Sequence, residues 1–309
     1  MTDKTPAEPL YELIRRIRRP ATLREMMAAC LRSVHMGDPF SCDEGGLPPM
    51  PQELIDQVMV SDTTIEDVRC AVYRPKVHNS ACPLILYMHG GGFVVGCSED
   101  TEYITRKLCH SNQAVVVSVN YRLAPETPYP GALDDCEKVL RAVIDAADKL
   151  QIDASSIHFA GDSAGGNLAL ALGLKLADAL PLKGLILLAP WLDMEMEKYE
   201  SYNRLAPTGI VFDAAFLAYC RASYVGFSDW KNPLVSPLHA SLENLPPTIA
   251  FIGTEDSLLD QVLQFKAKAA QIEVIVYPGM PHCFYTFPHL FDEEQDCFSR
   301  ITAFIRSSL

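Results

Sequence analysis

The 309-residue sequence has no apolar run long enough to cross a bilayer. Its longest such run, at residues 185–192, is far shorter than the roughly 20 residues that a transmembrane helix needs. Residues 1–4 also lack the hydrophobic segment that typifies a signal peptide. We therefore expect a soluble, cytoplasmic protein without membrane insertion.

Paired cysteine motifs are absent as well. The ten cysteines are scattered with no CxxC pair, and Cys70, Cys109 and Cys136 fall inside expected strands or helices, where a reduced cysteine packs as a small hydrophobe. No group of residues has metal-ligand spacing, and the glycine-rich stretches lack both a phosphate-loop lysine and the GxGxxG fingerprint. The sequence predicts a reducing compartment, no metal and no cofactor.

Positive charge is scarce. With 26 basic against 39 acidic residues the formal net charge is −13, which opposes binding to nucleic acid or an anionic membrane. We expect neither as a partner.

What the sequence has is a regular alternation of apolar strands and helix-length segments, typical of an α/β fold with a mostly parallel sheet. A polar turn between the first two strands indicates an antiparallel edge. We expect a helical cap segment at residues 1–55 and a catalytic domain at 56–309, with a cap insertion at about 194–230. The expected strands are residues 58–60, 68–73, 84–88, 115–119, 157–160, 185–189, 249–252 and 274–277.

One stretch, residues 157–169, combines an apolar run, a turn of small residues and the beginning of a helix. Gly161 and Gly165 flank Ser163 in a turn too tight for side chains at those two positions. Ser163 would then stand at the carboxyl end of a strand, facing the free N–H groups of the next helix. That arrangement suits acyl transfer, although a glycine turn with an incidental serine is the alternative interpretation.

Ligands of open α/β sheets bind beyond the carboxyl ends of the strands. Ser163, Asp256 and His282 each follow a different expected strand, so the three can converge. A serine hydroxyl attacks only when an imidazole accepts its proton, and an acid must orient that imidazole. We predict Ser163 as nucleophile, His282 as general base and then acid, and Asp256 as the orienting acid.

A second glycine cluster, His-Gly-Gly-Gly at residues 89–92, follows the strand expected at 84–88. We predict that the backbone N–H groups of Gly91, Gly92 and Ala164 form an oxyanion hole. For the acid, Glu255 and Asp260 are neighbours of Asp256, with Asp260 the second choice. His89 opens the glycine cluster, where a structural hydrogen bond and proton transfer are the competing interpretations.

These motifs, together with Tyr-Arg-Leu-Ala-Pro-Glu at 121–126 and Gly-Asp-Ser-Ala-Gly-Gly at 161–166, resemble the hormone-sensitive-lipase-like family of α/β-hydrolase esterases. The resemblance extends from about Val58 to the end. It implies an α/β-hydrolase fold, an eight-stranded sheet flanked by helices, a helical cap, and a homodimer through the last strand. Two positions depart from the family: Ser257 stands where a proline is usual, and Cys283 where a glycine is usual.

The expected function is hydrolysis of short- to medium-chain carboxylic esters, small-molecule substrates, through an acyl-enzyme. We expect five apolar residues near the catalytic turns or in the insertion to line the pocket: Phe93, Trp191, Phe212, Leu258 and Phe284. The alternatives are a non-catalytic small-molecule-binding protein on the same fold, or an amidase or lactonase using the same groups.

Overall fold

The computed structural model describes residues 50–308 except residue 79, residues 209–211 and residues 287–290. Most of the expected cap segment at residues 1–55 therefore lies outside the described residues. No helix among the described residues is long and apolar enough to cross a membrane.

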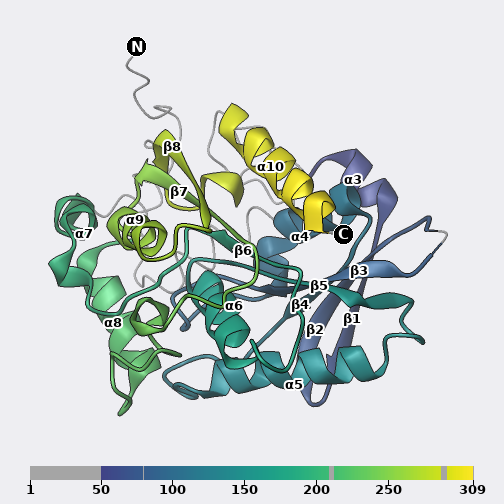
Figure 1. The fold of residues 1–309 in the computed structure, drawn as a ribbon, viewed down its shortest axis with the longest axis horizontal. Helices are drawn as coiled ribbons and strands as arrows, with labels where there is room; N and C mark the ends of the chain where they lie inside the picture. Colours follow the sequence, from purple (N-terminus) through teal and green to yellow (C-terminus); the bar gives the residue numbers. More distant parts are fainter. Residues whose placement is uncertain (1–49, 79, 209–211, 287–290, 309) are drawn as a thin grey trace, which may run out of the picture.

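An 8-stranded sheet with the order β1-β2-β4-β3-β5-β6-β7-β8 forms the centre of the molecule (Figure 1). The pairings β1–β2 and β2–β4 are antiparallel, whereas every pairing from β4 to β8 is parallel. All the predicted strands are present, and the antiparallel edge is confirmed. The strands are β1 (Val58–Ile65), β2 (Val68–Pro75), β3 (Cys82–Met88), β4 (Val115–Val119), β5 (Ile152–Asp162), β6 (Gly184–Leu188), β7 (Thr248–Glu255) and β8 (Glu273–Pro281).

Burial explains why the central strands are so apolar. Every residue of β4 and of β6 is buried, because helices cover both faces of a parallel sheet. In β1, at the edge, only Val58 is buried. The apolar runs that predicted the strands are therefore the signature of two-sided burial.

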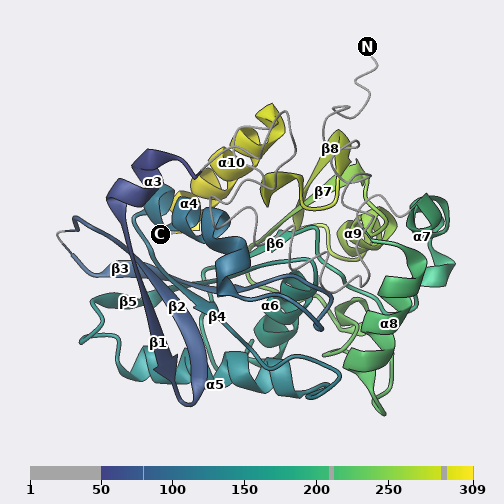
Figure 2. The ribbon, with the colours of Figure 1, turned by 180° about the vertical axis from the view of Figure 1, so that it is seen from behind.

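Two helical layers enclose the sheet. Helices α4 (Glu102–Asn112) and α10 (Asp292–Ser308) contact each other on one face, and α5 (Gly131–Asp145) and α6 (Ala164–Lys175) contact each other on the other. Both views show the sheet between these pairs (Figures 1 and 2). The short helix α3 (Gln52–Gln57) packs on α4, and α9 (Leu259–Lys268) packs on β7. Parallel strands in this arrangement bring their carboxyl ends to one edge.

The long connection between β6 and β7 holds the predicted insertion. It contains α7 (Glu200–Leu205), α8 (Ala214–Val225) and the short 3-10 helices η2 (Met196–Lys198), η3 (Ala206–Thr208) and η4 (Pro237–His239). Helix α8 begins where Asp213 caps it, accepting a hydrogen bond of 2.8 Å from the backbone N–H of Phe216. Helix α7 packs on α9, and both lie beside α8 at one end of the molecule (Figure 1).

Candidate active site

Ser163 occupies a sharp turn between a strand and a helix. Strand β5 ends at Asp162, α6 begins at Ala164, and Ser163 between them has φ 54° and ψ −117°. A Cβ at Gly165 would overlap the carbonyl oxygen of Met88, which is why the turn takes a glycine there. A residue other than glycine at positive φ costs on the order of 1–3 kcal/mol, and the surrounding packing holds Ser163 in that conformation.

The glycine cluster after β3 forms a tight loop close to this turn. Gly91 and Gly92 have φ of 114° and 62°, in the region that favours glycine, and the Gly91 carbonyl accepts hydrogen bonds from the backbone of Val94 and Val95. Gly92 lines the same pocket as Ser163. Ala164 is the first residue of α6, so its N–H belongs to the free amino-terminal group of that helix.

His282 and Asp256 are in direct contact. The His282 Nδ1 lies 2.7 Å from Asp256 Oδ2, and the other carboxylate oxygen, Oδ1, accepts the backbone N–H of Leu258 at 2.9 Å. Both side chains are buried. The opposite ring nitrogen, His282 Nε2, is buried without a hydrogen-bond partner among the described residues. His282 and Ser163 line one pocket.

Two opposing effects set the protonation of His282. Burial disfavours the charged imidazole, but the Asp256 carboxylate and the neighbouring Cys283 outweigh burial and raise the pKa of His282 well above its ordinary value. The imidazolium that forms when a histidine accepts a proton is therefore stabilised at this position.

The competing acids point elsewhere. Asp260 Oδ2 accepts the backbone N–H of Ser201 at 2.7 Å, which ties α9 to α7. Glu255 pairs with Arg204 at 3.4 Å on the surface. Of the three neighbouring acids, Asp256 is the one that contacts a histidine.

His89 has a structural environment. Its ring stacks on Tyr121 with centroids 4.2 Å apart, and its Nδ1 lies 2.8 Å from the carbonyl of Gly90. Burial lowers the pKa of His89 to about 4, despite that hydrogen bond. His89 is thus a neutral support of the glycine loop.

The pocket that Ser163 lines has a mostly apolar wall. Three of the five predicted pocket residues, Trp191, Phe212 and Leu258, line it. The other two are not among its lining residues: Phe93 is buried against Tyr224, with ring centroids 3.6 Å apart, and Phe284 is buried against aromatic neighbours. Proximity in sequence does not decide which way a side chain points. The lining is completed by Gly92, Ser163, Phe216, Leu217, Ser257 and His282.

Cys283, the departure beside the histidine, has φ 62°. That is the left-handed region where the resemblance places glycine. Cys283 therefore adopts the backbone conformation of the usual glycine in the turn after β8, with the strain that a side chain brings there.

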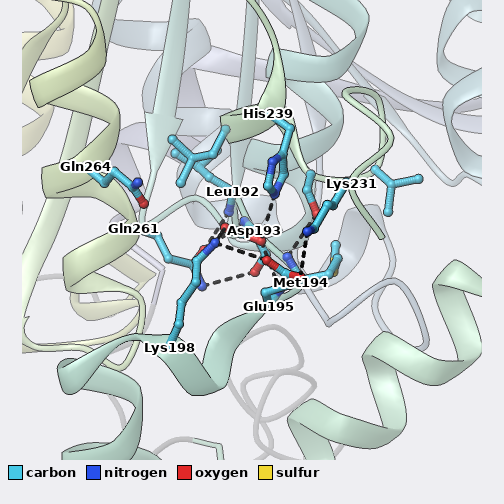
Figure 3. Close-up of polar contacts among 12 residues, drawn as sticks. Leu192, Asp193, Met194, Glu195, Lys198, Lys231, His239, Gln261 and Gln264 are labelled. Atoms are coloured by element: carbon cyan, nitrogen blue, oxygen red, sulfur yellow. Dashed lines mark hydrogen bonds and ion pairs between the residues drawn. The ribbon is translucent and has the colours of Figure 1, made fainter. Parts of the chain in front are cut away.

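A polar cluster anchors the insertion to α9 (Figure 3). The Gln261 side chain of α9 accepts the backbone N–H groups of Leu192 and Asp193, each at 2.9 Å. The buried Asp193 carboxylate pairs with Lys198 at 2.5 Å and accepts the Tyr199 hydroxyl at 2.7 Å. Burial opposes the charge of Asp193, but these partners outweigh it and lower its pKa.

Asp193, Glu195 and His239 offer ligand atoms within 4.8 Å of one another. The carboxylates already have ammonium partners, because Lys198 pairs with both acids and Lys231 lies 3.6 Å from Glu195. The cluster is thus a network of ion pairs that holds the insertion.

Sequence reasoning missed several residues around the site. Leu217 and Ser257 line the pocket, and Ser257 could have been suspected because it follows Asp256 directly. Asp162 belongs to the Gly-Asp-Ser-Ala-Gly-Gly motif, which gives no sign of its contacts. It is buried, and its Oδ1 accepts the Tyr87 hydroxyl at 2.7 Å and the Gly90 N–H at 2.9 Å. Burial raises the pKa of Asp162 to about 6, against those hydrogen bonds.

Several known proteins are similar to this chain in sequence or in fold. The model of the alpha/beta hydrolase fold family matches residues 85–286. An esterase of Acinetobacter venetianus is 34% identical over 75% of this chain and 77% of its own length, and the carboxylesterase NlhH of Mycobacterium tuberculosis is 32% identical over 77% and 79%. A crystal structure of an esterase from the bacterial hormone-sensitive lipase family superposes with a TM-score of 0.83, at 26% identity, covering 97% of each chain.

The chain therefore belongs to the alpha/beta hydrolase fold family, among the hormone-sensitive-lipase-like esterases. It is an enzyme, a serine hydrolase of the carboxylesterase kind. The binding-protein alternative is not favoured, because the relatives are esterases and the acid and histidine contact each other.

Proposed function

We propose that this enzyme hydrolyses carboxylic esters with short to medium acyl chains through an acyl-enzyme on Ser163. The observation that carries the proposal is the 2.7 Å contact of His282 Nδ1 with Asp256, which leaves the buried Nε2 unpartnered among the described residues in the pocket that it shares with Ser163. A base oriented in this way is what a serine nucleophile needs.

Two half-reactions follow from these roles. His282 Nε2 takes the proton of the Ser163 hydroxyl as its oxygen adds to the ester carbonyl, and then gives that proton to the departing alcohol. Water next adds to the acyl-enzyme, with His282 as base, and the carboxylic acid leaves as the Ser163 hydroxyl is restored. Asp256 remains ionised and stabilises the imidazolium in both steps.

The carbonyl oxygen becomes an oxyanion in both half-reactions. The N–H groups of Gly91, Gly92 and Ala164 are the proposed donors to it. The amino terminus of α6 adds the positive end of its dipole at the same place. Removing one such donor in a serine hydrolase costs on the order of 10²–10³ in kcat.

The pocket supports small esters as substrates. Its wall is mostly apolar and holds Ser163 and His282 together. Each buried CH₂ contributes about 0.8 kcal/mol, about fourfold in kcat/KM, until the apolar wall is filled. We expect kcat/KM to climb from acetyl to an optimum at about four to eight acyl carbons and then to fall as added carbons cause strain.

The test is a series of 4-nitrophenyl esters of increasing acyl length, assayed with the wild type and with Ser163→Ala. The wild type should show the optimum without interfacial activation, and the variant should lose on the order of 10⁶ in kcat with its fold intact by circular dichroism. Ester turnover by the variant above a few per cent would remove Ser163 from its role.

Substrates with the same acyl length also distinguish ester hydrolysis from amide and lactone hydrolysis. Matched 4-nitroanilides and lactones of the preferred acyl length should react far more slowly than the ester. Faster turnover of either one would make ester hydrolysis the side reaction.

A further inference from the structure

The side chain of Asp162 lies beside the triad, and its hydrogen bonds run to Tyr87 and Gly90. Asp162 is the last residue of β5 and immediately precedes Ser163. Its exposed fraction is 5%, and a buried carboxylate in that position calls for a reason, because removing a charge from water is costly.

The reason is found where β3 and β5 part. The two strands remain paired up to Met88 and Gly161. Asp162 pairs with Leu188 of β6 but has no partner in the β3–β5 ladder. Beyond that ladder its side chain makes the hydrogen bond: Oδ1 accepts the N–H of Gly90, two residues after Met88, at 2.9 Å.

The same oxygen is fixed from a second side. The buried Tyr87 hydroxyl of β3 donates to Asp162 Oδ1 at 2.7 Å. The approach to the loop is close, because a Cβ on Gly90 would overlap the other carboxylate oxygen, Oδ2. The Asp162 carboxylate thus lies between Tyr87 of β3 and Gly90, the first glycine of the loop.

A second hydrogen bond holds the same peptide of the loop. The Tyr121 hydroxyl donates to the carbonyl of His89 at 2.7 Å. Together the two hydrogen bonds hold both sides of the peptide that joins His89 to Gly90. Gly91 and Gly92 follow directly, both with positive φ.

We propose that Asp162 is a positioning residue for the oxyanion hole, and this inference rests on the proposed function. By accepting the Gly90 N–H it fixes the loop that carries the Gly91 and Gly92 donors relative to Ser163, its own neighbour in the chain. It acts as a hydrogen-bond acceptor, and its charge is not what the loop requires.

The experiment compares Asp162→Asn with Asp162→Ala. An asparagine Oδ1 can accept both hydrogen bonds, so its kcat should stay within about tenfold of the wild type. Alanine should lower kcat by about 10²-fold and leave KM within about threefold, because oxyanion donors act in the transition state rather than on the bound ester. The affinity for a trifluoromethyl ketone, which forms an oxyanion on the serine, should fall in parallel with kcat/KM.

Two further variants guard against a mere loss of folding. In Asp162→Ala alone, the buried Tyr87 hydroxyl loses its acceptor. The double variant Asp162→Ala/Tyr87→Phe removes that hydroxyl as well, and it should show the same loss of kcat. Tyr103 does not line the pocket, and Tyr103→Phe removes a buried hydroxyl that donates to Glu294 at 2.6 Å, so this variant should lower stability without lowering kcat.

An unchanged kcat in both alanine variants, a loss confined to KM, or an asparagine variant as slow as alanine would each overturn the proposal. If the wild type itself hydrolyses no ester, the proposed function fails instead, so the two failures are distinguishable.

Discussion

The catalytic turns and the insertion are built in different ways. In the turns the backbone does the positioning: Ser163 and His282 follow directly on β5 and β8, and Asp256 follows on β7. In the insertion side chains do it, through the cluster around Asp193 and through Asp260, which binds the backbone of α7. The two regions meet at α9, which begins just after Asp256 and carries both Asp260 and Gln261.

Because of this difference, we expect the turns to govern the rate of the reaction and the insertion to govern the choice of substrate. The turns depend on the register of a buried sheet, which one surface substitution does not move. The insertion supplies Phe216 and Leu217 to the pocket wall from α8, and its position depends on polar contacts that single substitutions can remove. Changes in the turns should therefore alter the rate by orders of magnitude, whereas changes in the insertion should alter substrate preference or stability.

The sharpest contrast uses two aspartates four residues apart. Asp256→Asn should lower kcat by about 10⁴, as the equivalent change does in a serine triad, because the asparagine favours the wrong imidazole tautomer. Asp260→Asn keeps an oxygen that can accept the Ser201 N–H, so its kcat should stay within about threefold of the wild type. Steady-state kinetics on one good ester measures both, and reversed effects would make Asp260 the acid.

The pH profile of kcat/KM reports the free enzyme's histidine. Only the neutral imidazole accepts the serine proton, so the rate should rise with pH as His282 is deprotonated, about tenfold per pH unit below the midpoint. Because Asp256 raises the pKa of His282, that midpoint should lie above the ordinary histidine value of 6.5. In Asp256→Asn it should move to lower pH, and a profile flat from pH 5 to 8 would argue against a histidine base.

A pocket variant should change preference instead of chemistry. Leu217→Ala makes room for about two more methylenes, so acyl chains beyond the wild-type optimum should gain about tenfold in kcat/KM relative to acetyl. Leu263→Ala is the matched control, because Leu263 is 43% exposed on α9 and does not line the pocket. An unchanged acyl-length profile in Leu217→Ala would mean that α8 does not contact the acyl chain.

The smallest effect is expected at the anchor of the insertion. Tyr199→Phe removes the hydrogen bond to Asp193 and should lower the free energy of unfolding by about 1 kcal/mol, with kcat unchanged. Tyr219→Phe changes an exposed tyrosine and should leave stability unaltered. Denaturant melts measure both, and a large kcat loss in Tyr199→Phe would show that the insertion shapes the chemistry itself.

Most of the fold could be predicted because burial on two faces makes each central strand an apolar run. The Ser163 turn could be predicted from the sequence because steric crowding at Gly165 leaves only glycine possible there. The pocket residues were harder to predict. Phe93 and Phe216 are both buried aromatics, and it is the packing of α8 that brings Phe216 into the pocket lined by Ser163. The role of Asp162 depends on which strand its side chain reaches, and sequence patterns carry no such information.

The most direct test of the account is to trap the nucleophile. A 4-nitrophenyl alkylphosphonate should release one nitrophenol per chain, and peptide mass spectrometry should locate the phosphonyl group on Ser163, with Ser163→Ala left unlabelled. Stoichiometric labelling of another residue, or labelling of the folded Ser163→Ala variant at the wild-type rate, would contradict Ser163 as the nucleophile.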